Sequence, residues 1–260
     1  MRIGVAATAP FGADVLERLA ARHDIAFVLT RPDAPAGRGR KIAPPPAKQI
    51  AERLGLRVLQ PERPEIDEVD AMVVAAYGLL IPEPLLEQAL WLNVHPSLLP
   101  RWRGAAPVER TLMAGDPETG VTIHRTVKEL DAGPIAAQAA FTINEDDAGA
   151  VFARAAELAA DLLEGVLAED ELRFEPQPEK GVTYADKITA ADRELDLSDP
   201  EQAVRVVRAL SPHIGARAQL DGRDVIVWSA RVEDGRFVPV EVQPAGKSRM
   251  SYEEFRRGLR

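Results

Sequence analysis

The chain has 260 residues, which is enough for one large α/β domain and a second, smaller domain. Apolar residues make up 46% and charged residues 28%, as in ordinary globular proteins, and no apolar run approaches the roughly 18 residues that a membrane span needs. The absence of cysteine excludes disulfides, thiolate nucleophiles and cysteine-bound zinc, and it fits a reducing compartment, so we expect a cytoplasmic protein. The net charge of -9 argues against a protein that coats nucleic acid through its overall field.

Apolar runs alternate with amphipathic stretches along the first two thirds of the chain, in the rhythm of repeated βαβ units. This rhythm predicts an α/β fold of the Rossmann-like kind, a mostly parallel sheet with helices on its faces. The expected strands are residues 2–7, 24–29, 57–59, 71–75, 92–95, 119–125 and 136–143. The expected helices are residues 13–21, 47–54, 84–89, 105–113 and a long closing helix at 148–168.

The composition changes after the closing helix. Residues 174–181 are rich in proline and charge, which is typical of an interdomain linker. Beyond them we expect a helix at 200–210 and short strands at 216–220, 224–232 and 236–242, with Asp221-Gly222 and Asp234-Gly235 as hairpin turns. We therefore place a first domain at residues 1–180, a linker at 181–195 and a small β-rich domain at 196–260.

The segment from residue 92 to residue 107 holds polar groups in a position suited to chemistry. Asn93 and His95 stand at the end of an expected buried strand, and ligands of open α/β sheets bind beyond the carboxyl ends of the strands. Because side chains alternate along a strand, these two residues point to the same side, where an amide donor and an imidazole can converge. Pro96 and Pro100 then stiffen the chain that leaves the strand.

A second polar cluster is the expected tight turn at residues 129–134. Gly133 permits backbone conformations that other residues avoid, and Pro134 fixes the conformation that follows. Asp131 lies in this turn, and a carboxylate that faces an imidazole would orient it and raise its pKa, keeping it a charged hydrogen-bond donor. We expect Asn93, His95 and Asp131 to form a catalytic trio.

These motifs together resemble the formyltetrahydrofolate-dependent formyltransferase family, through the Asn-x-His strand, the Ser-Leu-Leu-Pro loop and the Leu-Asp-x-Gly-Pro turn. The resemblance implies that Asn93, His95 and Asp131 are catalytic and that 10-formyltetrahydrofolate is the co-substrate. It further implies folate contacts by a folate loop of Ser97, Leu98, Leu99 and Pro100, and by main chain around Tyr77, Gly78 and Leu79. The four histidines are too far apart in sequence for a usual zinc motif, so no metal is expected.

Further motifs at residues 103–107, 119–123, 181–188 and 242–250 resemble the branch of this family that formylates initiator methionyl-tRNA for translation initiation. Two features depart from that branch. The first strand runs into Ala-Thr-Ala-Pro at residues 7–10 where the branch has Gly-Thr-Pro, and the C-terminal part is shorter than its five-stranded OB-type barrel, so we expect a shortened OB-like domain. The alternatives are another acceptor in the same family, such as an amino-sugar nucleotide, glycinamide ribonucleotide or water, or a regulator that only binds a nucleotide.

Residues 31–57 form a basic island, with seven basic residues against Asp33 and Glu52. Arg38, Arg40 and Lys41 within it are either part of a solvated loop or a grip on tRNA phosphates, and the long loop expected here favours the tRNA role. We expect the protein to act as a monomer with no membrane partner.

Three other features have less specific interpretations. His124 stands in an apolar strand, which favours a structural histidine. Trp102 is either a packing anchor or part of the acceptor cleft. The region of Gly4 and Gly12 lacks the G-x-G-x-x-G pattern of a nicotinamide site.

Overall fold

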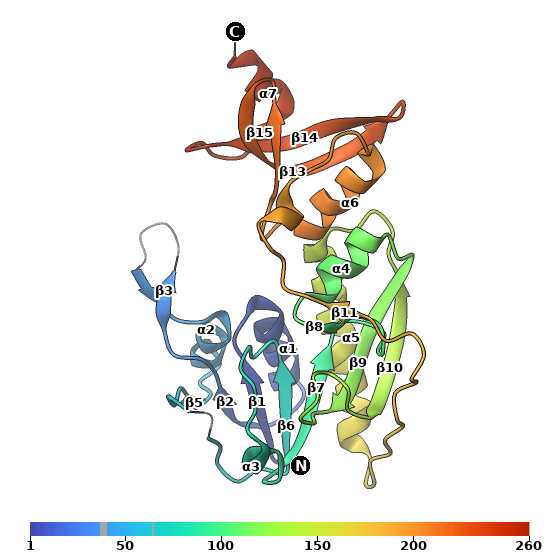
Figure 1. Ribbon diagram of the computed structural model, residues 1–260. Coiled ribbons are helices and arrows are strands. Elements are labelled where there is room, and N and C mark those ends of the chain that lie inside the picture. The colour runs from blue at the N-terminus through green and yellow to red at the C-terminus, as the bar shows by residue number, and fades with distance from the viewer. Residues whose placement is uncertain (37–40, 64, 260) are drawn as a thin grey trace. The chain divides into compact units, whose positions relative to one another are not determined.

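The computed structural model describes residues 1–36, 41–63 and 65–259 (Figure 1). The chain forms two compact units, each built from segments that are not consecutive in sequence. Unit 1 consists of Met1–Arg103, Gly120–Ala140 and Ala153–Thr183. Unit 2 consists of Gly104–Thr119, Phe141–Phe152 and Tyr184–Arg260.

The main sheet has the strand order β10-β9-β7-β6-β1-β2-β5 within the described residues. Its strands are β1 (Ile3–Ala7), β2 (Ile25–Leu29), β5 (Val58–Leu59), β6 (Ala71–Ala75), β7 (Leu90–His95), β9 (Glu118–Arg125) and β10 (Ile135–Thr142). The pairs β1–β2, β1–β6, β2–β5 and β6–β7 are parallel, and β9 pairs antiparallel with β7. The predicted mostly parallel α/β fold is confirmed. In chain order, β2 and β5 are added on one side of β1, and β6 and β7 are then added on its other side.

Helices cover the sheet of unit 1 as the βαβ rhythm predicts. They are α1 (Pro10–Ala20), α2 (Pro46–Arg53), α3 (Glu83–Leu86) and α5 (Ala148–Ala168), of which the residues from Ala153 onward belong to unit 1. Proline stands in the first turn of α1, α2 and α3, where its missing N–H has no helical partner to lose. Arg22, just after α1, donates to Asp161 and Glu164 of α5 at 2.7 and 2.8 Å, so the end of α1 is linked to α5.

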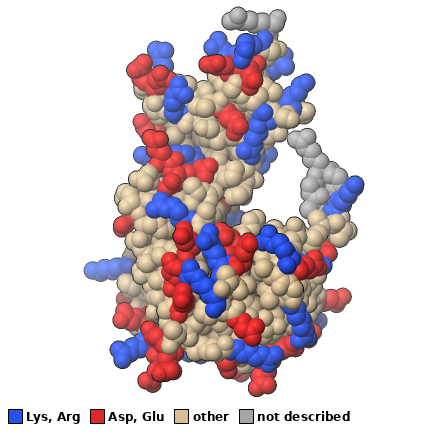
Figure 2. All heavy atoms as spheres, turned by 180° about the vertical axis from the view of Figure 1, so that it is seen from behind, with Lys and Arg blue, Asp and Glu red and all other residues tan. Residues whose placement is uncertain are grey.

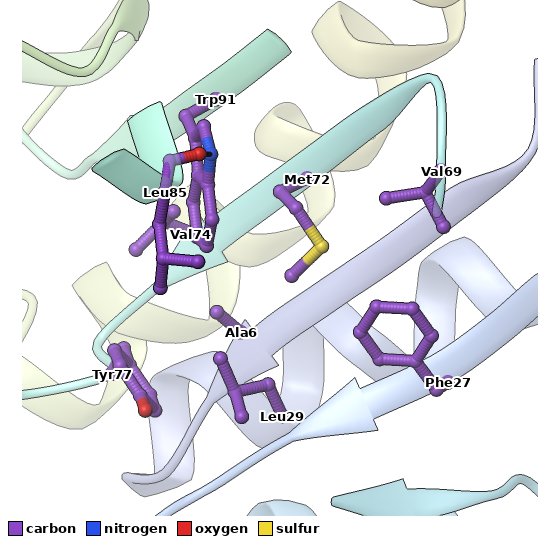
Figure 3. Close-up of a cluster of buried hydrophobic side chains, with 9 residues drawn as sticks. All are labelled: Ala6, Phe27, Leu29, Val69, Met72, Val74, Tyr77, Leu85 and Trp91. Atoms are coloured by element: carbon purple, nitrogen blue, oxygen red, sulfur yellow. Dashed lines mark hydrogen bonds between the residues drawn. The ribbon is translucent and has the colours of Figure 1, made fainter. Parts of the chain in front are cut away.

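A buried apolar cluster fills the face of the sheet that carries α3 (Figure 3). Trp91 is its largest member, and the indole Nε1 donates to the Leu85 carbonyl at 2.7 Å, so the one polar atom of the ring is satisfied. The strand residues of this cluster alternate with those on the opposite face, as expected for strands buried on both sides. The cluster consists of Ala6, Phe27, Leu29, Val69, Met72, Val74, Tyr77, Leu85 and Trp91.

The basic island is less irregular than the sequence suggested. Two short strands, β3 (Ala34–Ala36) and β4 (Lys41–Ala43), pair antiparallel where a long loop without structure was expected, and that expectation is wrong. The hairpin projects from the part of unit 1 that contains α2 (Figure 1). Ile42 is 66% exposed on it. Pro35 disguised the first strand, because proline in a strand is usually confined to sheet edges.

Unit 2 is a small antiparallel sheet with helices packed on it. Its strands are β12 (Ala216–Leu220), β13 (Arg223–Glu233), β14 (Arg236–Pro244) and β15 (Met250–Ser251), in that order. Asp221, Gly222, Asp234 and Gly235 have positive φ, which confirms both predicted Asp-Gly hairpin turns. The helices are α4 (Pro107–Ala114), the 3-10 turn Ala191–Arg193, α6 (Pro200–Leu210) and α7 (Tyr252–Arg257); the short strands β8 (Arg103–Gly104) and β11 (Tyr184–Ala185) form a separate two-stranded sheet.

Helix α4 belongs to unit 2, although it precedes β9 in sequence. It packs against α6, and Gln202 Nε2 donates to the Met113 carbonyl at 3.1 Å. Arg110 holds Asp192 with two hydrogen bonds of 2.7 and 3.1 Å, which keep the pKa of that carboxyl well below its usual range. These contacts explain why the compact units do not follow the order of the chain.

None of the helices that the structure describes is both long and apolar enough to cross a membrane.

Two helical glycines of unit 1 give matched predictions for stability. A Cβ on Gly12 would lie 2.1 Å from the Ala75 carbonyl oxygen, whereas a Cβ on Gly165 would meet no atom within 4 Å. We expect Gly12→Ala to reduce the free energy of unfolding by about 1–3 kcal/mol through overpacking. Gly165→Ala should be neutral or raise it by roughly 0.4–1 kcal/mol, since alanine favours helix. Denaturant titration measures both, and equal effects would contradict the close approach of α1 to β6.

Candidate active site

Two neighbouring strands and the turn after the second bring the predicted catalytic residues to one place in unit 1. Asn93 and His95 lie in the last three residues of β7, and Asp131 lies in the turn between β9 and β10. The antiparallel register of β7 and β9 sets His124 directly opposite Asn93. The pairing of these two strands therefore determines which side chains share the site.

The carboxylate of Asp131 is the centre of a polar cluster. Its Oδ1 accepts a hydrogen bond from Asn93 Nδ2 at 3.1 Å, and its Oδ2 lies 3.7 Å from His95 Nδ1. Oδ1 also lies 3.7 Å from His124 Nε2. The side chains of His95 and His124 are 5% and 2% exposed, so both imidazoles are almost closed to water. The structure thus brings Asn93, His95 and Asp131 together.

Backbone carbonyls determine where the protons of both imidazoles lie. His95 Nε2 is 2.8 Å from the Trp102 carbonyl oxygen, and since a carbonyl only accepts, Nε2 carries a hydrogen. By the same argument His124 Nδ1 carries a hydrogen, because it lies 3.1 Å from the Arg125 carbonyl. His124 Nε2 can then accept from Asn93 Nδ2, 3.0 Å away. Both hydrogens of the Asn93 amide are thus engaged, one by Asp131 and one by His124.

The pKa of His95 departs from the sequence-based expectation. Burial lowers this pKa and is the largest effect. Attraction by Asp131 and the hydrogen bond to the Trp102 carbonyl raise it, and His124 lowers it slightly. The expectation that Asp131 keeps His95 charged is therefore wrong for this arrangement, because desolvation outweighs the attraction of the carboxylate.

The turn that carries Asp131 has a demanding backbone. Asp131 has φ +47, in the left-handed region that non-glycine residues rarely adopt. A Cβ on Gly133 would lie 1.7 Å from the Arg125 carbonyl oxygen, so glycine is required for the turn to fold back on the end of β9. Such a conformation persists only where surrounding contacts support it.

The folate loop is tied firmly to β9. Thr122 Oγ1 donates to the Ser97 carbonyl at 2.7 Å and accepts from the Leu99 amide at 3.1 Å. Ser97 and Leu99 are 0% and 3% exposed, whereas Leu98 and Pro100 are half-buried. Side-chain contact with a ligand is therefore open to Leu98 and Pro100, while the side chains of Ser97 and Leu99 are enclosed by the protein.

The second predicted folate segment follows β6. Tyr77 is 3% exposed, and burial raises the pKa of its hydroxyl, while Arg31 acts in the opposite direction. Gly78 has φ +80, and Leu79 and Leu80 are 40% and 84% exposed. Tyr77 thus belongs to the core, and the following residues present main chain and apolar side chains at the carboxyl edge of the sheet.

The basic island is partly neutralised in the structure. Lys48 Nζ donates to Asp33 at 2.8 Å, and Arg53 Nη2 donates to Glu17 at 2.6 Å. Arg57 pairs with Asp67. On the face drawn in Figure 2, basic and acidic side chains are mixed with one another.

Two of the three predicted tRNA-binding residues, Arg38 and Arg40, lie outside the described residues. The third, Lys41, is exposed on β4. Lys48, Arg53 and Arg57 are paired with acids, so fewer basic side chains of the island are available for phosphates than the sequence suggested.

Sequence reasoning missed two residues that contact the cluster. His124, interpreted as structural, hydrogen-bonds Asn93, and its position could be found only from the register of β7 and β9. Gln177 lies in the segment interpreted as a linker, and its Nε2 donates to the carbonyls of Asp131 and Gly133, both at 2.8 Å. No local pattern in the sequence signals that contact.

The chain matches the formyl transferase family over residues 1–167, and it belongs to this family. It is 42% identical to a methionyl-tRNA formyltransferase of Methylococcus capsulatus over 98% of this chain and 96% of that protein. Two solved structures share the fold. A methionyl-tRNA formyltransferase from Clostridium thermocellum has a TM-score of 0.66 and 13% identity, and the match covers 95% of this chain and all of that one. An N-formyltransferase from Helicobacter canadensis, in complex with folinic acid and dTDP-3-aminofucose, has a TM-score of 0.67 and 14% identity, and the match covers 96% of this chain and 98% of that one.

The balance that sets the pKa of His95 can be tested with Asp131→Asn. This change keeps the shape of the side chain and the burial of His95 but removes the attraction, so the pKa of His95 should fall further. NMR titration of the imidazole measures it, with Asp192→Asn in unit 2 as a control that should leave His95 unchanged. An unaltered titration in Asp131→Asn would mean that this carboxylate does not act on His95.

Proposed function

We propose that this chain transfers the formyl group of 10-formyltetrahydrofolate to the amino group of initiator methionyl-tRNA, for translation initiation. The observation that carries the proposal is the convergence of Asn93 and His95 on Asp131, in a chain whose sequence follows a methionyl-tRNA formyltransferase over nearly its whole length. Initiator tRNA is used where translation takes place, so we place the activity in the cytoplasm, which fits the absence of cysteine.

In formyl transfer, the amine attacks the formyl carbon and negative charge develops on the formyl oxygen. The new bond joins the amine nitrogen to that carbon, the bond from the carbon to the folate nitrogen breaks, and one proton passes from the amine to the folate nitrogen. The enzyme must therefore supply donors to the oxygen and a carrier for the proton.

His95 suits the role of proton carrier. Its Nε2 hydrogen is used by the Trp102 carbonyl, so Nδ1 is the atom that can exchange a proton. Burial keeps the imidazole neutral at rest, so Nδ1 has a lone pair to accept the proton of the amine. Once charged, Nδ1–H can donate to the formyl oxygen or return the proton to the folate nitrogen, while Asp131 stabilises the imidazolium.

Asn93 suits the role of donor to the formyl oxygen. Its two amide hydrogens are held by a carboxylate and by a neutral imidazole, and hydrogen bonds to charged acceptors are roughly twice as strong as neutral ones. The formyl oxygen would therefore replace His124 rather than Asp131 as a partner of Nδ2.

The residues around the cluster fit a folate. A pteridine is flat and carries many hydrogen-bonding groups, so it needs main-chain partners and apolar cover. Gly78, Leu79 and Leu80 supply both after β6, and Leu98 and Pro100 supply partly exposed apolar side chains after β7. The folate brings the activated formyl group, and these residues would orient it toward Asn93 and His95.

The direct test is to incubate the protein with 10-formyltetrahydrofolate and either methionylated initiator tRNA or an amino-sugar nucleotide. We expect only the methionyl-tRNA to be formylated. Formylation of the sugar nucleotide alone would replace the proposed acceptor while keeping the reaction.

Removal of either donor should reduce turnover. His95→Ala and Asn93→Ala should each lower kcat by about a hundred- to a thousandfold, since each removes a group that acts on the transition state. Steady-state kinetics and melting temperature should be measured together. His213→Ala and Asn144→Ala in unit 2 are matched controls that should keep kcat. Full activity in either site variant would overturn the proposed site, and a loss that follows unfolding would assign a structural role instead.

The tRNA role of Arg38, Arg40 and Lys41 remains part of the proposal. Each lost phosphate contact should reduce the log-log salt slope of tRNA binding by roughly 0.7–0.9. The triple alanine variant should therefore raise KM for methionyl-tRNA and leave KM for the folate nearly constant. A control that removes three charges elsewhere in unit 1 is Arg18, Arg22 and Lys128 to alanine. If both triple variants bind tRNA alike, Arg38, Arg40 and Lys41 do not form the tRNA-binding site.

A further inference from the structure

The segment from residue 175 to residue 183, here called the strap, forms hydrogen bonds with the rest of unit 1 at Glu175, Gln177 and Thr183. At its start, Glu175 and Ile135 exchange two backbone hydrogen bonds of 2.7 and 2.8 Å. At its end, Thr183 Oγ1 accepts from the Trp102 amide at 2.8 Å, and the Thr183 carbonyl accepts from the Arg103 amide at 2.9 Å. The strap thus spans from β10 to the loop that follows β7.

Gln177 stands in the middle of the strap and uses both ends of its amide. Its Oε1 accepts from Arg103 Nε and Nη2 at 3.0 and 2.6 Å. Its Nε2 donates to the carbonyls of Asp131 and Gly133, both at 2.8 Å. The partners fix the orientation of the amide, because a guanidinium only donates and a carbonyl only accepts.

These four bonds join the two backbone supports of the polar cluster. On one side, Arg103 follows Trp102, whose carbonyl orients the ring of His95. On the other side is the turn that holds Asp131 at φ +47, a conformation that needs support from outside the turn. The side chain of Gln177 therefore links the backbone segment that orients the imidazole of His95 to the turn that places the carboxylate of Asp131.

We propose that Gln177 is a positioning residue for formyl transfer, which holds Asp131 in register with His95 by clamping the turn through its amide N–H groups. The inference rests on the proposed function for its effect on turnover. Its effect on the geometry of His95 and Asp131 does not depend on which reaction the chain performs.

Two substitutions of similar length separate the halves of the clamp. Gln177→Glu keeps an oxygen for Arg103 and strengthens that pair by charge, but it replaces both N–H donors with oxygen facing two carbonyls. Gln177→Met removes both halves. We expect both variants to lower kcat on the order of ten- to a hundredfold, as displacements of about 1 Å do in other sites, with little change in KM for the folate.

A second measurement reports on geometry without turnover. Asp131 raises the pKa of His95, so a turn that drifts away from the imidazole should lower this pKa in Gln177→Met, which adds no charge of its own, as NMR titration would show. Gln202→Glu in unit 2 is the matched control, since Gln202 is also half-buried and also donates from Nε2 to a carbonyl. It should leave both kcat and the His95 titration unchanged.

The outcomes are distinct. Lower kcat in both variants with a lower His95 pKa in Gln177→Met supports the clamp. Full kcat in Gln177→Glu would overturn it, because the Arg103 half alone would then suffice. Lower melting temperature with parental kcat and titration would overturn it in favour of a purely structural strap. If the parent protein formylates no methionyl-tRNA, the proposed function fails, and the His95 titration alone decides the positioning role.

Discussion

Three polar side chains converge on the carboxylate of Asp131, and the rest of the site is arranged to keep that carboxylate in place. It is 12% exposed, lies near two buried imidazoles and accepts a hydrogen bond from Asn93. A charge with so little water needs fixed partners, since misplaced donors would leave it uncompensated. Gln177 donates to the carbonyls of Asp131 and Gly133, and Gly133 lies close to the Arg125 carbonyl, so these contacts support the turn in which Asp131 has a positive φ.

Much of the fold could be predicted because local and global signals agree. The boundaries of β6, α5, α6 and β12 match the expected ranges, since each is a regular run with its own periodicity or cap. The β3–β4 hairpin was not predicted, because Pro35 removes the usual strand signal and the pairing is short. The sequence also could not predict that α4 belongs to unit 2, because this depends on its contacts with α6, which is distant in sequence.

In the site, too, residues in local sequence motifs could be predicted, and contacts set by the tertiary structure could not. Asn93, His95 and Asp131 stand in recognisable motifs, and the structure places them together. The protonation of His95 was predicted in the wrong direction, because a neighbouring carboxylate can be inferred from a motif but the depth of burial cannot. His124 and Gln177 were missed for a related reason, since their partners are set by strand register and by the path of the strap.

The choice of acceptor is a separate problem from the choice of reaction. A sheet edge with an amide, an imidazole and a carboxylate can assist formyl transfer to any amine that reaches it, so the shared fold alone does not select tRNA. Selection must come from groups outside the cluster. Lys48, Arg53 and Arg57 each form an ion pair with an acid, so Arg31 and Lys41 are the basic residues of the island that lie outside these ion pairs within the described part of the chain.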